Sequence, residues 1–194
     1  MWNFVGRQDD VQGNYDVLHG NWISGINFID EIRLGNQTKI TDDAKNNKAR
    51  NTYFFLPLIL GLIGFFFTYK YDKSIFWILL IFFLFTGLAL KVYLNERPFE
   101  PRERDYALVG SFYVFAIWIG LGAYNLCLEI KKYWKYKFAD IFTIFMIFLL
   151  VPFLMGFQNW DDHDRSNRYT AQAVAKSYLT SIPVSYTHLT LPTN

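Results

Sequence analysis

Four long apolar segments constrain the fold of this chain more than any other feature of its sequence. They run from residue 53 to 69, 74 to 94, 106 to 128 and 138 to 157. Each is close to the ~20 residues that a helix needs to cross a ~30 Å hydrocarbon core, and none carries a charge in its middle. A single span of this length satisfies its backbone groups only as a helix. The sequence therefore predicts an all-α membrane protein with four transmembrane helices in residues 52–157.

Residues 1–51 are polar and are predicted to form an extracytoplasmic loop with a short amphipathic helix. Trp22, Ile23, Ile26, Ile29 and Ile32 recur at helical spacing, with charged residues between them. Such a helix can lie in the membrane interface with its tryptophan as an anchor, or it can pack on a soluble neighbour. The pattern favours both arrangements equally.

The placement of lysine predicts the orientation of the spans. The connectors at 70–73 and 129–137 lie on one side of a four-span bundle and are dominated by lysine. Acids balance the arginines at 95–105 and in the tail on the other side. Because basic loops stay in the cytoplasm, we expect the two mixed-charge segments to face outward. The predicted partner is the lipid bilayer, and a net charge of +2 gives no bulk field that argues for nucleic acid.

The first mixed-charge segment, at 95–105, is a candidate anion site. Pro98 and Pro101 stiffen it. Arg102 and Arg104 carry guanidinium forks that bind carboxylates or phosphates at two points. The segment is therefore either a clamp for an anionic headgroup or an internal network in which neighbours such as Asp105 neutralise the arginines.

The second segment follows the last apolar segment. Near its start it contains a run of three aspartates and one histidine: Asp161, Asp162, His163 and Asp164. These residue types can bind a divalent metal. Acids also gather before helices, and Asp164 or Ser166 could cap a helix near 168–179. The helix start explains the pattern without a ligand, so no metal site is predicted.

Three motifs resemble those of large bacterial multi-span membrane proteins, formerly a domain of unknown function and now grouped with protein O-mannosyltransferase-like glycosyltransferases of the GT-C type. The motifs begin Gly20-Asn21-Trp22, Asn95-Glu96-Arg97-Pro98 and Trp160-Asp161-Asp162-His163, and the run from Lys45 to Gly64 also fits. The resemblance implies a longer parent in the bacterial inner membrane, with the charged motifs facing the periplasm. That parent would transfer a sugar such as mannose from a lipid-phosphate carrier to a protein acceptor. A lipid-linked sugar donor is thus expected, and no other cofactor is identified.

The resemblance also suggests roles for the two charged segments. Arg102, Arg104 and Asp105 would bind substrate at the edge of the donor or acceptor groove. Residues 158–183 would begin an extracytoplasmic soluble domain, coupled to the bundle by a set of charged side chains. These are Asp161, Asp162, His163, Asp164, Arg165 and Arg168. The catalytic acid is expected upstream, so the fragment would be inactive alone.

Two alternatives to an enzyme make different demands on the sequence. A transporter usually places ionisable residues at mid-membrane, and none of the four apolar segments does so. A non-enzymatic membrane scaffold or assembly module, in which the charged motifs only dock domains, stays open. An acid in an outward loop of the upstream sequence would favour the enzyme.

Two smaller features lead to further expectations. Residues 184–194 resemble a translated sequencing adapter, so no function is predicted for them. Gly61, Gly64, Gly120 and Gly122 are expected to be helix-packing contacts.

Overall fold

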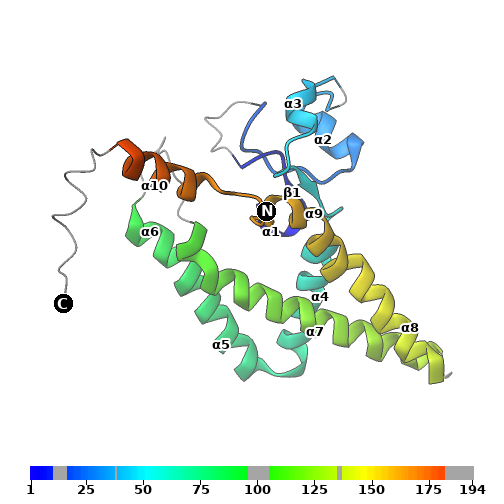
Figure 1. Ribbon diagram of the computed structural model, residues 1–194. Helices are drawn as coiled ribbons and strands as arrows, with labels where there is room; N and C mark the ends of the chain where they lie inside the picture. The colour runs from blue at the N-terminus through cyan, green and yellow to red at the C-terminus, as the bar shows by residue number, and fades with distance from the viewer. Residues whose placement is uncertain (11–16, 38, 96–104, 135–136, 182–194) are drawn as a thin grey trace. The chain divides into compact units, whose positions relative to one another are not determined.

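The computed structural model describes residues 1–10, 17–37, 39–95, 105–134 and 137–181. The chain divides into two compact units, Met1–Asp162 and His163–Asn194. Helices make up most of the described residues, and the strands are short (Figure 1).

Three helical stretches are long and apolar enough to cross a membrane among the residues described. The first, Lys73–Leu94, joins α5 (Lys73–Leu84), the π-helical turn η1 (Phe85–Ala89) and α6 (Leu90–Leu94). The second, Tyr106–Tyr133, contains most of η2 (Asp105–Leu108) and all of α7 (Val109–Tyr133). The third, Asp140–Asp161, runs through α8 (Lys137–Phe148), η3 (Leu149–Phe153) and α9 (Leu154–His163). The prediction of a helical chain with membrane-length segments is therefore confirmed.

The first of the four predicted spans, at 53–69, is not confirmed, because α4 (Leu56–Tyr71) has only 16 residues. Both of its ends are fixed by local structure. Phe54 and Phe55 adopt positive φ angles of 53° and 60°, which interrupts the helix before Leu56. At the other end, the Asp72 carboxylate accepts hydrogen bonds from the Ser74 and Ile75 amides and starts α5 instead.

The core of the bundle lies where α4 packs against α7. Gly61 contacts Phe115, and Gly64 contacts the backbone at Trp118 and Gly122. Val114, Phe115 and Trp118 form the buried cluster, and Phe65 packs edge-on against Trp118 at 5.1 Å between ring centroids. The expected helix-packing role is confirmed for three of the four glycines, whereas Gly120 has nothing within 4 Å.

The π-helical turn η3 has a local cause. Pro152 lies inside this stretch, and its ring removes one backbone N–H donor from the ladder. A widened turn accommodates that loss without ending the helix, so α8 and α9 remain continuous.

The polar part of the first unit precedes α4. It contains α1 (Trp2–Val5), β1 (Gly6–Arg7), α2 (Asn27–Leu34), α3 (Asp42–Lys45) and β2 (Asn51–Thr52). The strands pair antiparallel, with Gly6 opposite Thr52 and Arg7 opposite Asn51.

The predicted amphipathic helix is α2, but it starts later than its apolar pattern suggests. Trp22 and Ile23 lie before it, and Trp22 forms a bridge with Arg7. The helix buries Asp30 and Leu34, whereas Phe28 and Ile32 are exposed. In the second unit, α10 (Thr170–Ser181) confirms the helix expected near 168–179.

Candidate functional site

The predicted anion clamp lies mostly outside the described residues. Arg102 and Arg104 lie outside the described residues, and Asp105 begins the short helix η2. Substrate binding by these three residues stays a prediction.

The second charged segment is divided differently from the prediction. Asp161, Asp162 and His163 form the end of α9, so they do not precede a helix start. Asp164 Oδ1 accepts a hydrogen bond from the Ser166 amide at 2.9 Å, inside the turn that follows. Arg165 and Arg168 close that turn through a backbone hydrogen bond of 3.1 Å.

The two roles considered for this segment are metal binding and domain coupling. Among the residues described, no three His, Cys, Asp or Glu side chains converge as metal ligands. Domain coupling by Asp161 to Arg168 stays a prediction, as do the domain boundaries.

A buried carboxylate organises the chain before α2. Asp30 is 3% exposed and accepts hydrogen bonds from the amide of Ser24 at 2.9 Å, the Ser24 hydroxyl at 3.0 Å and the amide of Gly25 at 2.8 Å. A charged acceptor with this many donors is stabilised in spite of its burial. Asp30 therefore fixes the loop that carries Trp22 to Gly25.

Arg33, one turn later on α2, completes this structural cluster. Its guanidinium carbon lies 3.7 Å from the centroid of the Trp22 ring, and Nη2 donates to the Trp22 carbonyl. Burial lowers the pKa of Arg33, and the nearby Asp30 carboxylate opposes that shift. These contacts are internal, so we assign this cluster to folding.

A second polar cluster ties α9 to strand β2. Asn159 accepts a hydrogen bond from Asn51 Nδ2 at 3.0 Å and donates to the Tyr53 hydroxyl at 2.6 Å. The Thr52 amide donates to Gln158 Oε1 at 2.7 Å. The end of the last membrane-length helix is thus held against the polar part of the same unit.

A cavity of about 490 Å³ opens beside this tie. One wall is the segment from α3 to β2, which supplies Lys45, Lys48 and Arg50. The other wall is α9, where Gln158 and Trp160 are among the lining residues. Three cationic side chains from one segment make this the described cavity best suited to an anion.

Arg50 is the least exposed of these cations. Its Nη1 atom is buried and has no hydrogen-bond partner in the described part of the chain, while Nη2 lies 3.5 Å from Gln37 Oε1. Burial lowers the pKa of Arg50, and the carboxylates of Asp30 and Asp9 oppose the shift. An arginine remains protonated at neutral pH under these conditions.

Sequence reasoning missed this site. No binding site was predicted at the basic residues of 45–50. Their α9 neighbours are more than a hundred positions away, since Asn51 and Asn159 are separated by 108 positions. A signal was present in the polar residues Gln158 and Asn159, which follow the apolar part of the last membrane-length helix.

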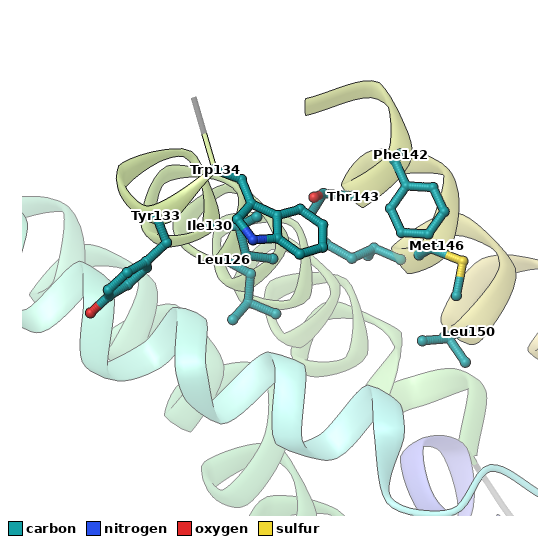
Figure 2. Close-up of a pocket in the computed structure, with 9 residues that line it drawn as sticks. Leu126, Ile130, Tyr133, Trp134, Phe142, Thr143, Met146 and Leu150 are labelled. Atoms are coloured by element: carbon teal, nitrogen blue, oxygen red, sulfur yellow. The ribbon is translucent and has the colours of Figure 1, made fainter. Parts of the chain in front are cut away.

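An apolar groove of about 460 Å³ lies between the end of α7 and α8 (Figure 2). Leu126 and Ile130 of α7 face Phe142 and Met146 of α8, and the Trp134 ring lies between the two helices. The groove offers almost no polar surface, so it suits a hydrocarbon chain rather than a charged ligand.

Comparison with known proteins points to a family other than the one the motifs suggested. A family profile described as urate oxidase N-terminal matches residues 26–121. No curated protein and no solved structure gives a significant match. The matched stretch contains the segment 95–105, so one of the motifs behind the glycosyltransferase resemblance lies inside the urate oxidase match.

The interpretation as a glycosyltransferase fragment is therefore wrong. The lipid-linked sugar donor and the protein acceptor were expected only because of that resemblance. Without it, no observation supports either of them as a ligand. The scaffold alternative gains no support from the match either.

Proposed function

We propose that this chain is the membrane-embedded portion of a protein that oxidises urate. The observation that carries the proposal is the match to the urate oxidase N-terminal family over residues 26–121. This stretch begins just before α2 and ends within α7. It therefore includes the cationic wall of the cavity and the α4–α7 packing core except Gly122, in addition to one complete membrane-length segment, Lys73–Leu94.

The membrane arrangement is a second part of the proposal. We infer that α4 is a fourth, short span, supported by its apolar composition and its packing against α7. Lysine placement supports a cytoplasmic side at 70–73 and 129–137, with the polar part on the opposite side. The bacterial inner membrane as the location stays a prediction, and so does the absence of a nucleic acid partner.

Urate binding by the full chain tests the proposal. The chain would be reconstituted in phosphatidylcholine nanodiscs and dialysed to equilibrium against radiolabelled urate, with empty nanodiscs as the blank. We expect saturable binding of urate that unlabelled urate displaces and that adenine, a neutral purine, does not. Retention no greater than in empty nanodiscs would contradict the proposal.

A further inference from the structure

The cavity between the α3–β2 segment and α9 has a net positive lining. Lys45, Lys48 and Arg50 carry three positive charges, against the single carboxylate of Asp161 among the lining residues. In the described part of the chain, neither lysine forms an ion pair, and Arg50 Nη1 has no hydrogen-bond partner. The two lysines are therefore not neutralised by the surroundings that the structure describes, whereas the carboxylates of Asp30 and Asp9 act on Arg50.

The amide of Gln158 adds an oriented donor. Its Oε1 atom accepts the Thr52 amide hydrogen at 2.7 Å, and only the oxygen of the side-chain amide can accept it. The Nε2 group is therefore the end that remains to donate. A ligand with carbonyl or charged oxygen atoms would satisfy it.

Two aromatic rings of α9 belong to the same lining. Phe157 and Trp160 are spaced three residues apart, which places them on neighbouring positions of the helix surface. The two residues are 73% and 74% exposed. The Phe157 ring stacks on Phe153 at 6.1 Å between ring centroids, so its other face and the Trp160 ring are the surfaces open to a ligand. Exposed aromatic faces beside cations favour a flat ligand over a tetrahedral anion, because a flat ring can stack on them.

We propose that this cavity binds a planar organic anion that carries both ring N–H groups and carbonyl oxygens. Its oxygens would accept from Arg50, the two lysines and Gln158, and a ring N–H would donate to Asp161. The cavity volume of about 490 Å³ lies within the ~300–1,000 Å³ usual for small-molecule sites. Urate has this chemistry, and naming it as the ligand rests on the proposed function.

Binding by variants of the full chain in phosphatidylcholine nanodiscs tests the site. Gln158→Glu keeps the acceptor for the Thr52 amide but replaces the donor with a negative charge. Lys48→Gln removes one exposed cation and leaves the fold alone. Each is expected to weaken urate binding about tenfold or more, as for loss of a charge-assisted contact. Lys39→Gln removes an exposed cation outside the lining and should bind like the unaltered chain.

Arg50→Lys separates the guanidinium fork from its charge. It should also weaken urate binding, because an ammonium group cannot make the two-point contact. Melting temperature is measured on every preparation, so that a folding defect in this half-buried position is recognised. Unaltered binding in Gln158→Glu and Lys48→Gln together would overturn the site, while urate binding by the unaltered chain would leave the proposed function standing.

Further probes distinguish the ligand class. Inorganic phosphate that competes with urate at equal concentration would overturn the preference for a planar anion. Loss of urate binding in phosphatidylglycerol nanodiscs would show that the cations serve lipid headgroups, which also overturns it. Orotate, a planar anion with ring N–H groups, is the last probe. If orotate binds with the same variant dependence and urate does not, the site stands and the proposed function fails. If neither binds, the site is overturned.

Discussion

Gly64 of α4 and Gly122 of α7 bring the backbones of the two helices into direct contact. A Cβ atom added at Gly64 would lie 2.7 Å from the amide nitrogen of Gly122, and one added at Gly122 would lie 3.0 Å from that of Gly64. Both added atoms would also meet a carbonyl oxygen of the facing helix. Small residues permit this approach, which is how apolar helices associate without a hydrophobic driving force.

Substitution of either glycine by alanine should destabilise the bundle. Alanine favours the helix intrinsically by up to ~1 kcal/mol, but the added methyl group meets backbone that cannot rotate away. We expect Gly64→Ala and Gly122→Ala to lower stability by about 1–3 kcal/mol, as overpacking usually does. The melting temperature of the purified chain in detergent measures the effect.

Gly120 provides the matched control for this experiment. It lies on the same helix, two residues before Gly122, and an added Cβ atom meets nothing within 4 Å. Gly120→Ala should therefore keep or raise the melting temperature. Equal losses at Gly120 and Gly122 would contradict the packing described for α4 and α7.

The parts of the fold that local sequence encodes were predictable. The length of an apolar segment identifies a membrane helix, because a helix satisfies all the backbone hydrogen bonds of a span within the span itself. The glycines on α4 and α7 indicated packing, although their pairing did not follow from the sequence. The late start of α4 was not predictable, because two phenylalanines at positive φ are uncommon and nothing nearby signals them.

The candidate site was not predictable for a different reason. Its two walls come from Lys45–Arg50 and from the end of α9, and only the tertiary fold brings them together. The dense charges at 95–105 instead indicated an anion site at Arg102 and Arg104, which lie outside the described residues. A motif resemblance then suggested a family that the profile match contradicts.

Asp30 should be essential for folding of the polar part. In Asp30→Asn, an amide NH₂ would replace one oxygen and face the donors of Ser24 and Gly25. Leaving buried donors without an acceptor costs about 1–3 kcal/mol. Thermal unfolding followed by tryptophan fluorescence should show this loss. The exposed neighbour Glu31 is the control, and Glu31→Gln should change stability by no more than about 0.5 kcal/mol.

The tie between α9 and the strand region should appear as coupling between Asn159 and Tyr53. Their side chains are joined by a hydrogen bond of 2.6 Å. Asn159→Ala and Tyr53→Phe should each lower the melting temperature, and the double variant should lose less than the sum. A coupling free energy of about 0.5 kcal/mol or more is expected for residues in one network. Strict additivity would show that the hydrogen bond contributes nothing to stability.

Cysteine accessibility tests whether α4 crosses the membrane. Only α4 separates Lys48 from Lys73 among the membrane helices, and its 16 residues extend about 24 Å, less than the ~30 Å hydrocarbon core. In a Cys127→Ser background, Lys48→Cys should react with an impermeant thiol reagent once the outer envelope is opened. Lys73→Cys should react only after the membrane is disrupted, because its lysine-rich loop is expected in the cytoplasm.

Each of the other possible labelling patterns at these two cysteines indicates a different topology. Reaction of Lys73→Cys alone would invert the orientation drawn from the lysines. Reaction of both positions from one side would show that α4 does not cross, which leaves three spans. Asn167→Cys decides between the two counts independently, because it follows the last membrane-length segment. With four spans it must share the reactivity of Lys48→Cys, and with three it must be protected when Lys48→Cys reacts.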